Sequence, residues 1–300
     1  MNDELRSIIK EHNLRPLSYR KIKKAYIIDT KNDRYVLKPN TNNYDIYKYL
    51  ISRDFNYFPH NYNTRSGNYD LSHYIEDNSL NNDQKLNDLI SVVATLHKKT
   101  SYLREIDLDD IKEIYEKLSY AINESIKYYS NLNDYIDTVM FYSPSEYLLV
   151  RNISLIYFML EFSRRKLDNW YSLIKEEKSI RNSLVHNNLD LDHLLINKGY
   201  YLISWDKATF SQPIDDLYSL YSNYYNRIEL SDFLKSYQGI SSLNKLETDL
   251  LLIKLSIPKI IEFTSDTYQD TKKINDLLFY LNKIYKLIRN DSLIEKDVSR

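Results

Sequence analysis

Residues 184–208 read LVHNNLDLDHLLINKGYYLISWDKA. Three short apolar runs occur in this stretch, at residues 184–185, 194–196 and 200–203, and polar residues follow each of them. Short runs of this kind, bounded by Asn, Asp and Gly, are typical of β-strands joined by turns. We therefore expect a hairpin over residues 184–206. The Asn and Asp residues after the first run are also what a loop with a chemical role contains.

The chain on either side of this stretch divides into two parts. Short segments with alternating apolar and polar residues dominate residues 1–76, whereas most of residues 77–300 has the three-to-four apolar spacing of helices. The sequence thus predicts a β-rich N-lobe at 1–76 and a helical C-lobe at 77–300, which holds the hairpin 184–206. The expected strands are 19–24, 25–30, 34–37 and 68–75, and the expected helices are 43–53, 83–99, 108–140, 145–178, 214–225, 231–237, 245–265 and 270–289, one of them interrupted by Pro258.

The composition excludes several kinds of function. Of the 300 residues, 43% are hydrophobic and 28% are charged, which is a globular rather than a disordered composition. The formal net charge of −1 predicts no overall attraction to nucleic acid or to anionic lipid. The absence of Cys excludes disulfides, thiolate metal ligands and cysteine nucleophiles. No apolar stretch approaches the roughly 20 residues of a spanning helix, and the polar N-terminus is unlike a signal peptide, so we expect a cytoplasmic protein without membrane insertion.

Five short motifs occur in order along the chain. They are Val36–Leu37–Lys38, VATLH at 93–97, LVH at 184–186, LISWD at 202–206, and Pro213 with Asp216–Leu217. They resemble the strand-end lysine and the motifs LA-x-LH, LVHGDLHPGN, LIDWE and DP-x-x-DL of the aminoglycoside phosphotransferase and choline kinase superfamily, relatives of the protein kinases. The resemblance implies an α+β, two-lobed protein-kinase-like fold, with a small antiparallel β N-lobe and a mostly helical C-lobe. In length and N-terminal style the chain is similar to the bacterial spore-coat kinase-like branch.

The same resemblance implies that the residues assigned to phosphoryl transfer have been replaced. Asn188 stands at the position of the catalytic Asp, and an amide cannot accept a proton from a hydroxyl. His193 stands at the position of the metal-binding Asn and Ser204 at that of the metal-binding Asp, whereas Mg²⁺ prefers carboxylate and other oxygen ligands. We therefore expect that Mg²⁺ is not bound in the usual way. The hairpin at 22–33 contains no Gly, which hinders close approach of its backbone to phosphate.

Other residues of the family pattern are kept. Lys38 matches the lysine that contacts the phosphates of ATP, and Asp45 is the candidate for its acidic partner. His186 is expected to brace the loop that follows it. His97 and Asp216 match positions with structural roles. The sequence keeps the frame of the family's site while it loses the charged groups.

Three Asp residues near the loop leave a second interpretation open. Asp190, Asp192 and Asp206 either replace the lost carboxylates or serve as local caps that accept hydrogen bonds from nearby backbone N–H groups. A hydrolase dyad or a metal site built on His186 is disfavoured, because neither has a recognised spacing here.

The sequence thus predicts a catalytically degenerate kinase-like protein, a pseudokinase, with a binding, regulatory or assembly role toward an unidentified protein partner. In this interpretation ATP is retained through Lys38 without Mg²⁺-dependent turnover. The alternative is a divergent ATP-dependent phosphotransferase that acts on a small-molecule hydroxyl through replacement Asp residues. No motif specifies the substrate, the partner or the oligomeric state.

Overall fold

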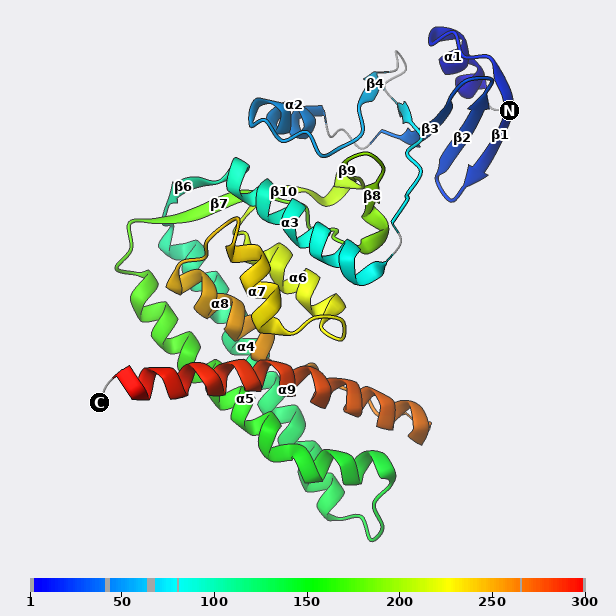
Figure 1. Ribbon diagram of the computed structural model, residues 1–300. Coiled ribbons are helices and arrows are strands. Elements are labelled where there is room, and N and C mark those ends of the chain that lie inside the picture. The colour runs from blue at the N-terminus through cyan, green and yellow to red at the C-terminus, as the bar shows by residue number, and fades with distance from the viewer. Residues whose placement is uncertain (1–2, 41–43, 64–67, 80, 265, 299–300) are drawn as a thin grey trace. The chain divides into compact units, whose positions relative to one another are not determined.

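The computed structural model describes residues 3–40, 44–63, 68–79, 81–264 and 266–298 (Figure 1). The chain forms two compact units. The first contains Met1–Thr100 and His186–Thr209, and the second contains Ser101–Val185 and Phe210–Arg300. The loop that follows Val185 therefore belongs to the same unit as the N-terminal sheet.

The first unit contains a five-stranded antiparallel sheet with the strand order β1-β2-β3-β5-β4 (Figure 1). Because side chains alternate between the two faces of a strand, one face carries the apolar residues Ile28, Leu37 and Leu71. Leu5 and Ile8 of helix α1 pack with them in one core cluster. The bounds are α1 Asp3–Glu11, β1 Pro16–Ile22, β2 Ala25–Thr30, β3 Arg34–Pro39, β4 Asn61–Asn63 and β5 Tyr69–His73.

Two helices and a short hairpin complete the first unit. Strands β8 and β9 pair antiparallel, and helix α3 packs against the 3₁₀ turn η1 that precedes β8. Trp205 in the second 3₁₀ turn, η2, is buried, with its ring 6.1 Å from that of Phe55. The bounds are α2 Tyr44–Ser52, α3 Asn82–Thr100, η1 Leu191–His193, β8 Leu194–Ile196, β9 Tyr200–Leu202 and η2 Trp205–Lys207.

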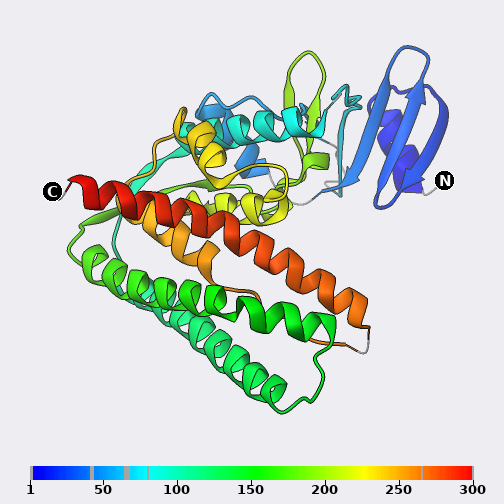
Figure 2. The ribbon, with the colours of Figure 1, turned by 60° about the horizontal axis from the view of Figure 1, so that its bottom comes forward.

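The second unit is mainly helical. Helix α5 packs against α4, α8 and α9, and the three longest helices run along one another in Figure 2. A small sheet has β7 between β6 and β10. Capping boxes at Ser143 and Asn244 begin α5 and α8 by pairing the first free backbone N–H groups. The bounds are β6 Tyr102–Glu105, α4 Leu108–Asp137, α5 Pro144–Ile174, β7 Ser179–Val185, β10 Thr209–Ser211, α6 Ile214–Tyr224, α7 Leu230–Gln238, α8 Lys245–Ser256 and α9 Thr267–Val298.

The expected fold class is confirmed, because the chain is α+β with a small antiparallel sheet followed by a mostly helical part. Two local expectations are wrong. The apolar run 184–185 ends β7, which pairs with β6 and β10, so the hairpin covers only residues 194–202. The helix expected at 245–265 ends at Ser256, because Pro258 cannot donate a helical hydrogen bond and disfavours helical backbone in the residue before it. The expected lobe boundary between residues 76 and 77 falls inside the first compact unit and stays a prediction.

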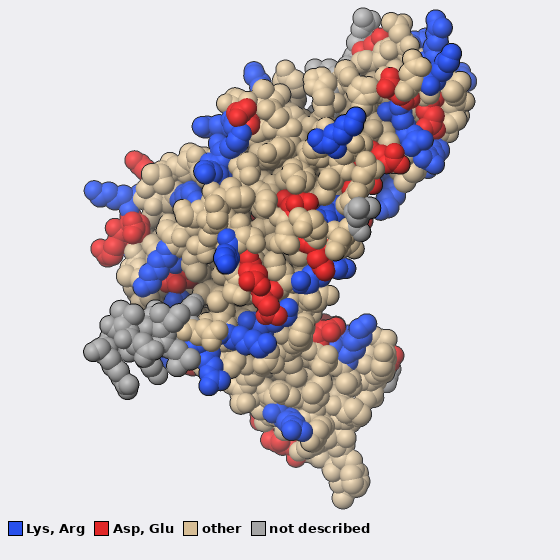
Figure 3. All heavy atoms as spheres, in the orientation of Figure 1, with Lys and Arg blue, Asp and Glu red and all other residues tan. Residues whose placement is uncertain are grey.

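The distribution of charged side chains on the surface agrees with the charge balance of the sequence. Acidic and basic side chains are interspersed over the face seen in Figure 3, in keeping with the formal net charge of −1. Within the described ranges, no helix combines the length and the apolar character needed to span a membrane.

Candidate functional site

A pocket of about 560 Å³ lies beside the C-terminal end of β3. Its lining comes from the first unit alone, from the β1–β2 turn, the strands β3 and β5, and the residues that follow β9. The charged side chains in the lining are Lys23, Lys24, Lys38, Asp70 and Asp206. The pocket therefore brings together three lysines and two carboxyl groups.

A second cavity of about 260 Å³ shares Lys38 and Ile203 with the first pocket. Its walls are mainly aliphatic, and include Ile27, Val36, Ile75, Leu195 and Ile203. The backbone groups of Ile75, which lines this cavity, take part in no hydrogen bond among the residues that the structure describes. Apolar walls with a few free polar groups are the usual form of a small-molecule site, and here they suit a flat ring with a polar edge.

Lys38 lies at the end of β3, opposite Asp70 in the register of β5. Exclusion of solvent lowers the pKa of the Lys38 ammonium, and the charge of Asp206 acts in the opposite direction. Burial raises the pKa of the Asp70 carboxyl group. Asp45 lies on the exposed first turn of α2, outside the pocket lining, and no described ion pair joins it to Lys38. The expected pairing of Lys38 with Asp45 is therefore not formed, and the carboxyl groups that share the pocket with Lys38 are those of Asp70 and Asp206.

The β1–β2 turn brings charge to the pocket. Lys23 has a φ of 53°, in the left-handed region that favours Gly, and both Lys23 and Lys24 line the pocket. The sequence showed the absence of Gly here, but these two lysines and Asp70 were not singled out. The β3–β5 register, in which Lys38 faces Asp70, is the signal that identifies Asp70, and it depends on strand pairing rather than on local sequence.

His186, the first residue after β7, joins the loop that it begins to Ile203, the first residue after β9. Its side chain is buried, and its Nε2 lies 3.0 Å from the backbone oxygen of Ile203. Because a carbonyl oxygen can only accept, Nε2 carries the proton in this contact. The imidazole ring also packs against Trp205, with 4.7 Å between the ring centroids. The next residue, Asn187, has a φ of 55° where the family motif has Gly, a conformation that Asn tolerates better than most residues.

Hydrogen bonds link the three positions that the sequence predicts to be replaced, Asn188, His193 and Ser204. The Asn188 amide donates to the backbone oxygen of Ser204 at 3.4 Å, and Nδ1 of His193 donates to the backbone oxygen of Asn188 at 2.6 Å. Ser204 has left-handed backbone angles, with φ 68° and ψ 51°. An amide, an imidazole and a hydroxyl do not provide the carboxylate oxygens that Mg²⁺ prefers, so these three side chains do not fit a Mg²⁺ ion.

Of the three Asp residues considered as replacements, Asp206 lines the pocket, and the other two do not. Asp190 accepts a hydrogen bond from the backbone N–H of Asp192 at 2.9 Å and caps η1, while Asp192 is exposed. Asp190 therefore has the geometry of a local cap. The two remaining residues of the family pattern, His97 in α3 and Asp216 in the first turn of α6, are fully buried.

The structure is similar to solved structures of small-molecule kinases. The aminoglycoside phosphotransferase from Alicyclobacillus acidocaldarius subsp. acidocaldarius DSM 446 gives a TM-score of 0.64 at 12% identity, over 95% of this chain and 96% of that chain. The AMP-bound spectinomycin phosphotransferase APH(9)-Ia gives 0.52 at 13% identity, over 94% of this chain and 98% of that chain. Choline kinase LicA from Streptococcus pneumoniae gives 0.48 at 14% identity, over 96% and 98%. No family model matches the sequence, and no curated protein matches it.

Proposed function

This chain has the fold of the aminoglycoside phosphotransferase and choline kinase-like superfamily, and we propose that it is a pseudokinase that binds an adenine nucleotide without transferring its phosphate. Its role would be binding, regulation or assembly, exerted on a protein partner. The observation that carries the proposal is the state of the replaced positions. Asn188 and His193 are held in the loop's own hydrogen bonds, while a pocket remains beside Lys38. The cytoplasmic location and the kinship with the spore-coat kinase-like branch stay predictions from the sequence.

The chemistry of the two cavities supports nucleotide binding. The aliphatic cavity, lined by Ile75 with no hydrogen bond at its backbone within the described residues, suits a purine ring. The lysines of the adjoining pocket, Lys23, Lys24 and Lys38, would attract the phosphates. The spectinomycin phosphotransferase with a similar fold was crystallised with AMP, which is a ligand of this class.

The loop chemistry argues against phosphoryl transfer. Transfer requires a group that orients or deprotonates the attacking hydroxyl, and metal ions that neutralise the developing charge. The amide of Asn188 cannot accept a proton, and the hydroxyl of Ser204 cannot replace a metal-binding carboxylate. In the proposed state, lysines rather than Mg²⁺ therefore balance the charge of the phosphates.

A divergent phosphotransferase that acts on a small-molecule hydroxyl is the second candidate. Asp70 and Asp206 line the same pocket as Lys38, and one or two carboxylates together with substrate phosphates are a common way to hold Mg²⁺. Burial raises the pKa of Asp70, so a Mg²⁺ ion bound here would have to offset this cost of ionising the carboxyl group.

Thermal melting with ATP, in excess Mg²⁺ and separately in chelator, tests the proposal. We expect ATP to raise the melting temperature equally in both conditions, because a ligand that binds only the folded state stabilises it according to its affinity. Lys38→Ala should remove most of this rise. The matched control, Lys31→Ala, changes an exposed lysine in the β2–β3 turn outside the pocket and should keep the rise.

Two other outcomes have distinct meanings. A rise that requires Mg²⁺ and is lost in Asp206→Asn, together with release of ADP when small-molecule alcohols are added, would replace the pseudokinase by the phosphotransferase. The absence of any rise in both conditions would refute nucleotide binding.

A further inference from the structure

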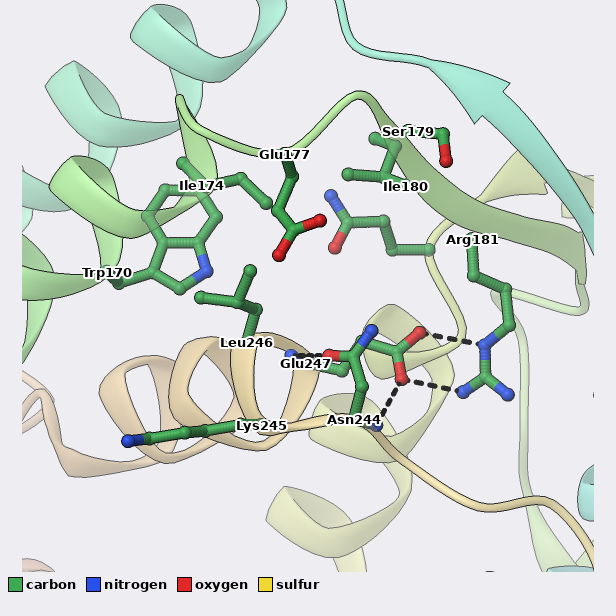
Figure 4. Close-up of a pocket in the computed structure, with 11 residues that line it drawn as sticks. Trp170, Ile174, Glu177, Ser179, Ile180, Arg181, Asn244, Lys245, Leu246 and Glu247 are labelled. Carbon is green, nitrogen blue, oxygen red and sulfur yellow. Dashed lines mark hydrogen bonds and ion pairs between the residues drawn. The ribbon is translucent and has the colours of Figure 1, made fainter.

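Another pocket, of about 290 Å³, lies wholly within the second unit (Figure 4). It is formed by the end of α5, the start of β7 and the first turn of α8, with Gln212. It shares no lining residue with the pocket beside Lys38.

The first residues of α8 line this pocket and bring free backbone N–H groups to it. The first N–H groups of a helix have no partner within the helix. The capping box pairs the N–H of Glu247 with the side chain of Asn244 and the N–H of Asn244 with the side chain of Glu247, both at 2.8 Å. It leaves the N–H groups of Lys245 and Leu246 available, and the helix dipole adds a partial positive charge at this end.

The indole of Trp170 supplies an independent donor. Its side chain is only 1% exposed, and Figure 4 shows the nitrogen-bearing edge of the ring turned toward the pocket. In the described part of the chain, no hydrogen bond to its Nε1 is formed. The indole N–H is open to the pocket, so a ligand with acceptor oxygens can accept a hydrogen bond from it.

Glu177 supplies the complementary charge. Glu177 is solvent-exposed, its carboxylate points into the pocket in Figure 4, and its side chain makes no ion pair or hydrogen bond with any residue that is described. Arg181 and Glu247 neutralise each other through two hydrogen bonds, of 2.7 and 2.9 Å, and the side chain of Lys245 extends away from the pocket. Glu177 is therefore the charge that a ligand would meet. The apolar part of the wall consists of Ile174, Ile180 and Leu246.

We propose that this pocket binds a small zwitterion, a free α-amino acid with an aliphatic side chain. The carboxylate accepts hydrogen bonds from the Trp170 indole and from the first turn of α8, and the ammonium group pairs with Glu177. The aliphatic side chain packs on Ile174, Ile180 and Leu246. A volume of about 290 Å³ is at the small end of ligand pockets, which suits a molecule of this size rather than a nucleotide.

The two tryptophans of the chain allow a direct test, since Trp170 lines this pocket and Trp205 lines the pocket beside Lys38. The full chain is labelled with fluorotryptophan, and its two fluorine resonances are assigned with Trp170→Phe or Trp205→Phe. L-Leucine should shift the Trp170 resonance saturably and leave the Trp205 resonance in place. L-Leucinamide, which lacks the carboxylate, and N-acetyl-L-leucine, which lacks the ammonium group, should each bind at least about tenfold more weakly, because each loses charge-assisted hydrogen bonds.

Variants of the acidic group complete the test. Glu177→Gln should weaken L-leucine binding at least about tenfold and leave N-acetyl-L-leucine binding unchanged. The matched control, Glu176→Gln, changes the adjacent carboxylate, which is exposed like that of Glu177 but lies outside the lining, and it should leave both affinities unchanged. The proposal is overturned if millimolar L-leucine gives no saturable shift of the Trp170 resonance, if the three compounds bind equally, or if the two variants have the same effect.

Discussion

Asp70 ionises in surroundings that oppose its charge. Burial raises the pKa of the Asp70 carboxyl group. When the pKa of a carboxyl group is higher in the folded than in the unfolded state, the free energy of unfolding falls as the pH rises from the unfolded pKa to the folded pKa. That interval begins at the unfolded value of about 4. Asp70→Asn removes this dependence. We therefore expect the variant to melt at a higher temperature than the unchanged protein at neutral pH, and this difference should disappear as the pH falls below about 4.

Melting temperatures measured across this pH range check the expectation. Asp192→Asn is the matched control, because Asp192 is an exposed carboxylate of the same unit, and it should change the melting temperature less at neutral pH. A variant Asp70→Asn that melts lower than the unchanged protein at neutral pH would contradict the argument, and would indicate that the charge of Asp70 stabilises the fold.

Strand β7 is joined to helix α8 by the ion pair of Arg181 with Glu247. The two residues form two hydrogen bonds, of 2.7 and 2.9 Å, and their side chains are 18% and 7% exposed. Removal of one partner leaves the other charge buried, which typically costs about 3–5 kcal/mol in the free energy of unfolding. Arg181→Met should approach this loss in urea unfolding. Arg164→Met removes the arginine of an exposed pair with Glu161 and should cost less than about 1 kcal/mol.

If Arg181→Met and Arg164→Met lower the free energy of unfolding equally, burial of the Arg181–Glu247 pair has no energetic consequence. The double variant Arg181→Met with Glu247→Leu provides a further check. It should recover part of the loss, since it removes the buried charge, but not all of it, since the capping box of α8 also uses Glu247.

At the scale of the whole molecule, each of the two compact units has its own cavity. A ligand slows amide hydrogen exchange most in the part of the chain whose local opening it opposes. ATP should therefore slow exchange in the first unit, at residues 25–39, 69–77 and 194–206, and leave α4 in the second unit unchanged. Exchange measured by mass spectrometry with and without ATP checks this expectation, with inorganic phosphate as the control ligand. Slowed exchange that is confined to α4 or α9 would instead place the nucleotide in the second unit.

The helices and strands that could be predicted from the sequence are those whose apolar residues repeat with a clear helical or strand period. The strands 25–30 and 34–37 and the helices around 83–99 and 108–140 follow from the period of their apolar residues, and the structure places β2, β3, α3 and α4 there. Helix α1 was missed, although Leu5, Ile8 and Ile9 have helical spacing, because the segment is otherwise polar. The period of apolar residues predicts a helix over 245–265, but α8 ends at Ser256, because Pro258 ends the helix rather than kinking it.

By itself, the sequence determined the fold class and the order of the long helices and of the central strands, because these depend on residue identity and on spacing along the chain. The replacement of carboxylates at positions 188 and 204 stays a prediction from the sequence. Only the tertiary structure decided which residues share a pocket. Lys38 faces Asp70 through the β3–β5 register rather than pairing with Asp45, and the residues 184–185 join the sheet of β6 rather than the hairpin. The pocket of Trp170 and Glu177 is also a product of tertiary packing, because α8, which begins at Lys245, is far along the chain from α5 and β7. Strand pairing and helix packing join segments whose separation along the chain is large, and local patterns of residues carry no information about which segments will meet.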